Sequence, residues 1–277
     1  MKLPGRINVL LLAAFLSTCG GADNPFDLEA IEGRSCVDAD AEIPETECIA
    51  LVFFFVNTDG PNWTNHTGWG ESNRPCSWFG VVCTNGSVSS LILSSNGLAG
   101  SIPRQFTGLQ NLHTLELREN QLTGPIPPEF RGLLKLRVLD LGNNQLTGTI
   151  PPGLGDISIL GLLNLGGNQL TGTIPSEFGN LLTLGQLFLG RNQLTGTIPP
   201  ELSNLSNLQF LSLRDNLLEG LVPFPVASLG GQLQSAGLDR CRFESNPGLS
   251  MPGSPDYKDA DLDGDGFICG IELSPPS

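Results

Sequence analysis

The chain has 277 residues, of which 28 are acidic and 14 are basic, and its formal net charge is −14. Proteins that bind nucleic acid or an anionic membrane surface need clustered basic residues, and this sequence has no such cluster, so neither is an expected partner. Its 35 glycines and 21 prolines predict a backbone with many bends.

Residues 1–22 have the layout of a secretory signal. Lys2 and Arg6 precede an apolar run from Val9 to Leu16, which is too short to span a bilayer. We therefore expect an exported protein, secreted or held at the cell surface. The stretch LSTC, which ends at Cys19, also resembles the bacterial lipoprotein box, in which the cysteine is lipidated and attaches the protein to a membrane. Ordinary cleavage a few residues later explains the same stretch, and both alternatives stay open.

Residues 23–87 are expected to form an N-terminal region that includes a cap. The run IALVFFFV, residues 49–56, has eight apolar residues, which are too few to cross a membrane. We predict that this run is a helix or strand that covers the open end of the structure that follows.

From residue 88 the sequence repeats at a fixed interval, and one full unit is LGQLFLGRNQLTGTIPPELSNLSN, residues 184–207. A fixed period of this length marks a solenoid of stacked turns. We predict repeats over 88–245, in which a degenerate seventh unit, from Leu233 to Cys241, places Cys241 where the asparagine belongs. The six regular units begin near Val88, Leu112, Leu136, Leu160, Leu184 and Leu208.

Within each unit the pattern LxxLxLxxN predicts a short strand followed by a sharp bend. Apolar residues such as Leu115 and Leu117 alternate with the period of two that a half-buried strand requires. Stacked turns then form a parallel sheet with strands about 4.8 Å apart. An asparagine amide both donates and accepts, so we expect a buried line of amides that pair with backbone groups of adjacent turns. These are Asn96, Asn120, Asn144, Asn168, Asn192 and Asn216.

The longer pattern LxxLxLxxNxLxGxIPxxLxxL resembles the plant-type leucine-rich repeat, found in plant extracellular receptors and in inhibitors of wall-degrading polygalacturonases. DGPNWTNHTGW (59–69) and CSWFGVVC (76–83) resemble the N-terminal cap of that family. The resemblance covers roughly residues 45 to 245. It implies an α/β solenoid, a right-handed leucine-rich repeat superhelix with a parallel β-sheet on its concave face. It implies much less about a ligand, because a fold does not determine a function.

Binding residues are expected on the concave face, at the outward positions between the inward leucines, where the units differ. Such an extended mixed surface suits an extracellular protein, a peptide or a polysaccharide. Glycines of the middle units, such as Gly166 and Gly190, indicate either a plain solvated surface or room for a close-lying ligand. The candidate residues are His113, Glu116, Arg118, Asp140, Asn164, Phe188, Arg191, Phe210 and Arg214.

Seven cysteines occur, and Cys19 is either lipidated or removed, which leaves six. An even number in an exported chain favours disulfides. Local spacing suggests the pairs Cys36–Cys48 and Cys76–Cys83, of which the second is also the pair that the family resemblance implies. Cys241 and Cys269 remain, either paired with each other or with Cys241 free and buried in place of an asparagine.

The C-terminal tail, residues 246–277, contains the stretch DLDGDGFICGIE, residues 261–272. It fits the calcium-loop template, in which three aspartates, a backbone carbonyl and a bidentate glutamate surround one ion. Its flanks are too rich in proline and glycine for a complete helix–loop–helix, so we expect a single structural Ca²⁺ site of extracellular strength. The expected ligands are Asp261, Asp263, Asp265, the carbonyl of Phe267 and Glu272.

No sequence motif predicts an enzyme. The two histidines are His66 and His113, and we expect His113 to form a surface pair with Glu116 rather than an acid–base couple. No nucleophile motif or phosphate-binding loop occurs. Two classes of function remain. One is an exported recognition module that binds a partner on its concave face, and the other is a structural cell-surface protein that calcium stabilises without a specific ligand.

Overall fold

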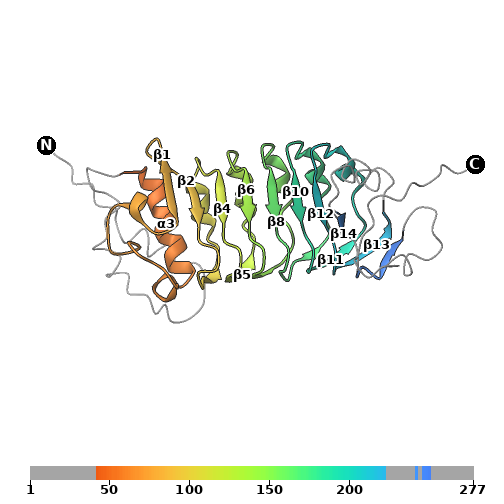
Figure 1. Ribbon diagram of the computed structural model, residues 1–277, viewed down its shortest axis with the longest axis horizontal. Coiled ribbons are helices and arrows are strands. Elements are labelled where there is room, and N and C mark those ends of the chain that lie inside the picture. Colours follow the sequence, from red (N-terminus) through yellow and green to blue (C-terminus); the bar gives the residue numbers. More distant parts are fainter. Residues whose placement is uncertain (1–41, 223–240, 243–244, 251–277) are drawn as a thin grey trace, which may run out of the picture.

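The computed structural model describes residues 42–222, 241–242 and 245–250, which form a solenoid of stacked turns with a helix at its N-terminal end (Figure 1). The predicted signal, Cys19, Cys36, Cys269 and the calcium loop at 261–272 lie outside these residues. Within the described part of the chain, no helix has the length and apolar character needed to cross a membrane.

One face of the solenoid is an eight-stranded sheet, which confirms the predicted parallel sheet. Its repeat strands pair in parallel, with equivalent residues side by side, as Leu115 with Leu139. The first strand, β1, runs antiparallel to β2. In sheet order the strands are β1 (Val81–Thr84), β2 (Ser87–Ile92), β4 (Thr114–Glu116), β6 (Val138–Asp140), β8 (Leu162–Asn164), β10 (Gln186–Phe188), β12 (Phe210–Ser212) and β14 (Cys241–Arg242).

Each turn then returns through a second short strand and a 3₁₀ helix, which begins after the proline of the IP motif. The second strands form two smaller sheets, β3 (Ala99–Ser101), β5 (Gln121–Pro125) and β7 (Gln145–Thr147), and β9 (Thr171–Gly172), β11 (Gln193–Gly196), β13 (Leu217–Leu221) and β15 (Gly248–Ser250). The 3₁₀ helices are η3 (Arg104–Gly108), η4 (Pro128–Gly132), η5 (Pro152–Asp156), η6 (Ser176–Asn180) and η7 (Pro200–Asn204).

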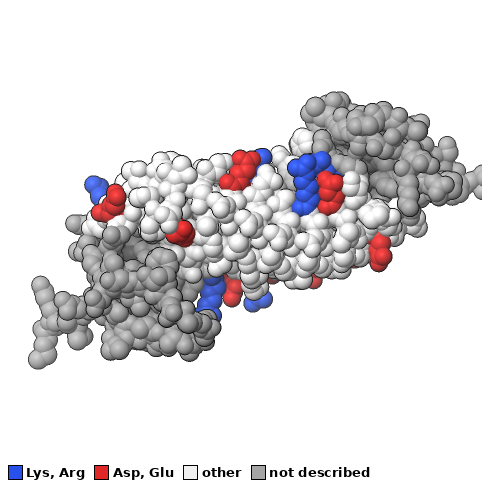
Figure 2. All heavy atoms as spheres, turned by 90° about the horizontal axis from the view of Figure 1, so that it is seen from below, with Lys and Arg blue, Asp and Glu red and all other residues white. Residues whose placement is uncertain are grey.

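The face of the solenoid seen from below carries few charges. Figure 2, a view from below, shows Lys, Arg, Asp and Glu side chains in separate small groups on an otherwise uncharged surface. Ion pairs of this exposed kind contribute little to folding stability. The described residues contain the ion pairs Arg74–Glu42, Arg118–Glu119, Arg191–Asp215 and Arg214–Asp215.

The predicted capping segment is a helix, α3 (Glu45–Asn57), followed by two short 3₁₀ helices, η1 (Gly60–Asn62) and η2 (Pro75–Ser77). It packs against η3 of the first turn, where the Phe54 and Phe106 rings lie 5.1 Å apart, edge to face. The Oε2 atom of buried Glu47 accepts the N–H of Val88 at 2.6 Å. The helix therefore covers both the apolar core and an otherwise unpaired backbone donor at the open end of the sheet.

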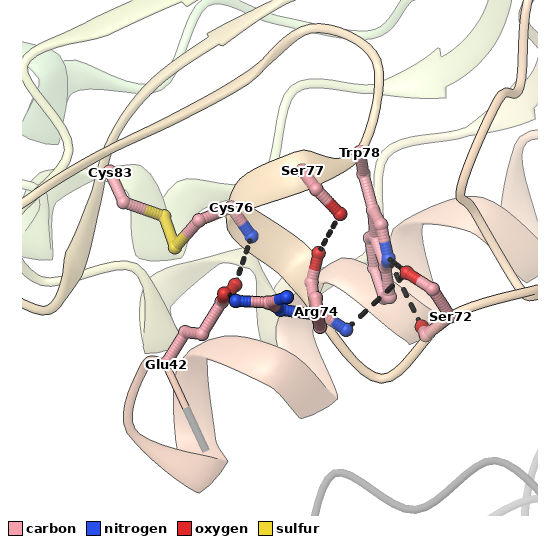
Figure 3. Close-up of polar contacts among 7 residues, drawn as sticks. All are labelled: Glu42, Ser72, Arg74, Cys76, Ser77, Trp78 and Cys83. Atoms are coloured by element: carbon pink, nitrogen blue, oxygen red, sulfur yellow. Dashed lines mark hydrogen bonds and ion pairs between the residues drawn. A yellow bond between two sulfur atoms is a disulfide. The ribbon is translucent and has the colours of Figure 1, made fainter. Parts of the chain in front are cut away.

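The rest of the cap is held by packing of Trp69 against Trp63 and Trp78 and by one disulfide and polar contacts, which Figure 3 shows. Cys76 and Cys83 are joined, as predicted. Glu42 forms an ion pair with Arg74 at 3.0 Å and accepts the N–H of Cys76 at 3.1 Å, while the indole N–H of Trp78 donates to Ser72. These contacts and the backbone hydrogen bonds of its turns hold the cap loop in place. Cys48 of α3 is also disulfide-bonded.

The predicted asparagine ladder is confirmed. The six asparagines from Asn96 to Asn216 are between 3% and 9% exposed. Asn144 shows the repeated contacts: its Oδ1 accepts the N–H of Leu122 at 3.0 Å, and its Nδ2 donates to the carbonyls of Leu117 and Leu141, both at 3.0 Å. Each amide thus joins its own turn to the preceding turn.

The predicted register of the seventh unit is wrong. Cys241 pairs with Leu211 of β12, so it occupies a leucine position on the strand, and Asn246 takes the ladder position. The Oδ1 of Asn246 accepts the N–H of Leu218 at 3.1 Å, and its Nδ2 donates to the carbonyl of Leu213 at 2.9 Å. The regular interval of 24 residues after Asn216 would place the ladder residue at position 240. The last turn is therefore longer than the others, and a prediction made close to the regular interval missed Asn246.

Candidate functional site

The outward side chains of the eight-stranded sheet form rows across the concave face, because parallel pairing aligns equivalent positions of successive turns. Five of the predicted binding residues lie on two of these rows. The first row contains Ser90, Thr114, Val138, Leu162, Gln186 and Phe210, and the second contains Ile92, Glu116, Asp140, Asn164, Phe188 and Ser212. The predicted outward positions therefore meet on one continuous surface.

Asp140 is at the centre of the second row. Its Oδ1 accepts hydrogen bonds from the N–H of Gly142 at 3.0 Å and from Nδ2 of Asn164 at 2.8 Å. Burial raises the pKa of this carboxyl group above its ordinary value, since removal from water disfavours the charged form, although the bond from Gly142 and the charge of Arg118 act in the opposite direction. The pair Asp140–Asn164 is a fixed polar group in the middle of the face.

A third row follows the strands and contains Arg118, Gly142, Gly166, Gly190 and Arg214, which are equivalent positions of successive units. The three glycines form a strip without side chains, which we call the glycine lane. A Cβ atom at Gly142 would lie 2.5 Å from Nδ2 of Asn164, and one at Gly190 would lie 2.8 Å from Oγ of Ser212. Since neighbouring side chains occupy that space, the lane is a level floor with an arginine at each end.

At one end of the lane, Arg118 forms an ion pair with Glu119, with 2.8 Å between the charged atoms. Oγ of Ser95 donates to Glu119 at 2.9 Å. The hydrogen bond from Ser95 and the positive charge of Arg118 both lower the pKa of this exposed carboxyl group, so it stays ionised at neutral pH. This end presents a positive and a negative group side by side.

At the other end, aromatic and basic side chains come together. The rings of Phe188 and Phe210, on adjacent strands, have centroids 6.5 Å apart. Beside them Asp215 contacts Arg191 at 3.6 Å and Arg214 at 3.9 Å. We refer to Phe188, Arg191, Phe210, Arg214 and Asp215 as the Arg–Phe end. Four of these five were predicted as binding residues, and the structure places them in one group.

His113 lies just before β4, beside the first row, and its Nδ1 is enclosed by the protein and makes no hydrogen bond. The ion pairs of the described residues do not include one between His113 and Glu116.

Three exposed apolar residues at the cap end were not predicted. Ile92 is 42% exposed on the second row, Val82 is 46% exposed on β1, and Phe79 is 40% exposed nearby. Extension of the repeat frame one turn towards the N-terminus would have found Ile92, because it is paired with Glu116. Val82 and Phe79 belong to the cap, which has no periodic pattern.

The predicted calcium ligands, Cys269 and Cys19 lie outside the described residues. Among the residues that are described, no group of three or more His, Cys, Asp or Glu side chains is arranged to hold a metal ion.

Comparison with known proteins agrees with this geometry. Two family models described as leucine rich repeat match residues 86–146, and residues 160–181 and 183–205. A relative of Arabidopsis thaliana, named leucine-rich repeat receptor protein kinase EMS1, is 37% identical over 70 residues, which are 25% of this chain and 6% of that kinase. The match thus spans a small part of the relative's length.

Solved structures of receptor kinases resemble this one over most of its described length. A pollen receptor kinase 3 superposes with a TM-score of 0.59 at 33% identity, over 70% of this chain and 90% of the other. The chain belongs to the leucine-rich repeat proteins. A second leucine-rich repeat structure, the Arabidopsis receptor kinase HAESA solved with the peptide hormone IDA and the co-receptor SERK1, gives a TM-score of 0.50 at 28% identity, over 74% of this chain and 42% of the other. These similarities establish the solenoid and its plant-type repeats.

Proposed function

We propose that this protein is an exported recognition module that binds an extended peptide segment of an extracellular partner along the concave face. The observation that carries the proposal is the glycine lane, which is bordered by polar and charged side chains. Because the lane is level and has no side chains of its own, an extended peptide backbone can lie along it between the flanking polar groups. The resemblance to HAESA, a receptor kinase solved with a peptide hormone, supports a ligand of the same class.

Each part of the face offers different chemistry to such a peptide. Asp140 and Asn164 bear oxygen and nitrogen atoms that can accept and donate hydrogen bonds at mid-length. The Arg–Phe end combines two aromatic rings with two guanidinium groups, and aromatic and arginine side chains supply most of the binding energy in typical interfaces. We therefore expect an apolar or acidic peptide residue to anchor there, while the part over the glycine lane contributes mainly backbone contacts.

The proposal includes the C-terminal calcium loop, which is supported by its sequence alone. Asp261, Asp263, Asp265, the carbonyl of Phe267 and Glu272 supply the number and kind of oxygen ligands that Ca²⁺ prefers. A single loop of this type binds Ca²⁺ with an expected Kd on the order of 10⁻⁴ to 10⁻³ M, which suits an extracellular structural role. Export is supported by the N-terminal signal layout and by the receptor kinases among the relatives.

A peptide-display selection tests the binding function. Random peptides are selected on the immobilised protein, and the enriched sequences are titrated against Phe188→Ala, Arg191→Ala and Phe210→Ala. We expect each variant to weaken binding by about tenfold or more, as truncation of an anchor residue does. Arg104→Ala is the matched control, since this exposed arginine lies on η3, on the opposite side of the turn.

Two results would contradict the proposal. If no peptide is enriched above a surface without protein, the alternative of a structural protein without a concave-face ligand stands. If the enriched peptides bind all three variants and Arg104→Ala equally well, they occupy another surface, and the assignment of the concave face is wrong.

A further inference from the structure

A groove of about 580 Å³ lies away from the concave face, along the corner between the second strands and the 3₁₀ helices η5, η6 and η7. It spans the third, fourth and fifth units, and these are the three units that read TGTIP. The first, second and sixth units read AGSIP, TGPIP and EGLVP at the same place. The groove thus coincides with the three units that share the TGTIP motif, and this motif lies outside the concave face.

The geometry of this groove is fixed by close packing between turns. The second threonines of the three motifs, Thr149, Thr173 and Thr197, line it in a row. A Cβ atom at Gly172 would lie 2.9 Å from the methyl group of Thr149, and one at Gly196 would lie 3.0 Å from that of Thr173. Because the methyl groups fill the space above these glycines, the rotamers of the threonines are restricted and their hydroxyl groups stay in register.

One wall of the groove is acidic. Glu177 and Glu201, which occupy the same position in successive units, both line it and both are exposed. A Cβ atom at Gly179 would lie 2.6 Å from the carbonyl oxygen of Glu201, so the two 3₁₀ turns that carry these glutamates stack closely. No lysine, arginine or histidine is among the lining residues. Within the described residues, no ion pair includes either glutamate.

We propose that this groove binds a lysine-rich polypeptide segment in an extended conformation. An ammonium group has three donors and no acceptor, and the glutamate carboxylates and threonine hydroxyls provide acceptors along one line. The aliphatic stems of lysine side chains lie well on apolar surface, which Ile150, Ile174 and the lining prolines supply. The net charge of −14 adds a long-range attraction for a basic partner. A neutral saccharide would use the hydroxyls but gain nothing from the two negative charges.

This site is separate from the proposed peptide site, and its test does not depend on that proposal. A fluorescent oligolysine peptide is titrated into the full-length protein at low ionic strength. We expect binding that Glu177→Gln/Glu201→Gln weakens by roughly five- to tenfold, since two exposed charged contacts are lost. Binding should also weaken when salt is raised to about 1 M, at which charge interactions are screened within about 3 Å.

The control pair is Glu129→Gln/Glu219→Gln, which changes the net charge equally. Glu129 holds the same repeat position in the second unit, and neither residue lines the groove. We expect binding to this pair to stay within about twofold of the wild type. An equal loss in both pairs would mean that oligolysine responds only to net charge, and the site would be wrong.

A second variant blocks the groove without any change of charge. Thr173 is exposed at its centre, so Thr173→Trp fills the space, and its melting curve is compared with that of the wild type. A variant that melts normally and binds oligolysine as tightly as the wild type would overturn the proposal. So would a neutral oligosaccharide that binds the wild type and loses affinity in Thr173→Trp, if oligolysine does not bind.

Discussion

Replacement of Asn144 by alanine tests the asparagine ladder at its centre. The side chain is 8% exposed, and Leu122 N–H donates to its Oδ1. The carbonyls of Leu117 and Leu141 are less affected, because Asn120 donates to the first and Asn168 to the second. The main cost is therefore one buried N–H group left without a partner, and we expect the free energy of unfolding to fall by about 1 to 3 kcal/mol.

Urea unfolding followed by circular dichroism measures this loss, with the slope of the transition compared between proteins. The control is Arg137→Ala, which removes an exposed side chain next to the same sheet and is expected to change stability by less than about 0.5 kcal/mol. An Asn144→Ala protein as stable as Arg137→Ala would show that the ladder contacts are replaced by water or relaxation, and the reasoning would be refuted.

Three further predictions concern other parts of the molecule. Calorimetric titration should detect Ca²⁺ binding that Glu272→Gln weakens much more than Asp259→Asn, because Asp259 lies outside the loop; equal losses would reduce the segment to an acidic turn. The pKa of Asp140 is raised, so its contribution to stability is present below the ordinary pKa of 3.8 and is lost as pH rises through the raised pKa. Asp140→Asn should therefore gain stability relative to the wild type as pH increases from about 3 to 7 in urea unfolding, and a stability difference that does not change with pH would contradict the burial argument. Gly196→Ala should lower the melting temperature, with a cost of about 1 to 2 kcal/mol, because its φ is 75° and the new Cβ would meet Thr173, whereas Gly132→Ala has open space and should be nearly neutral; equal effects would exclude strain as the cause.

The repeat turns could be predicted from sequence because each of their features depends on a short local pattern. The inward leucines, the asparagine line and the bends all recur once in every unit, so one misread position is corrected by the equivalent positions of the other units. The capping helix was predicted only as a helix or strand, since eight apolar residues fit both. Its helical form depends on packing against η3, which sequence periodicity does not show.

The last turn was mispredicted because its register depends on chain length rather than on residue type. Cys241 and Asn246 both follow apolar residues at the spacing of the repeat pattern. The pairing of Cys241 with Leu211 and the hydrogen bond from Leu218 to Asn246 show that Asn246 is the ladder residue. Identification of Asn246 by sequence would have required a search for the pattern at spacings longer than the regular unit.

The sequence predicted which residues lie at outward positions of the concave face, but not which of these residues contact one another. Arg118, Asp140 and Phe188 were identified because they lie at outward positions of the frame. The groove at the TGTIP motifs was not identified, because binding residues were sought only at positions where the units differ. Its lining residues, such as Thr149, Thr173 and Thr197, instead recur unchanged at the regular interval.

The asparagine bonds run in one direction along the solenoid, and this has a consequence for how the protein is made. The Oδ1 of each ladder asparagine accepts an N–H from the turn before it, from Asn96, which serves Asn65 in the cap, to Asn246, which serves Leu218. During synthesis from the N-terminus, every newly folded turn completes the one made just before it. In a partly made solenoid the N–H group that awaits a ladder asparagine therefore lies in the last folded turn, and the next turn supplies its acceptor.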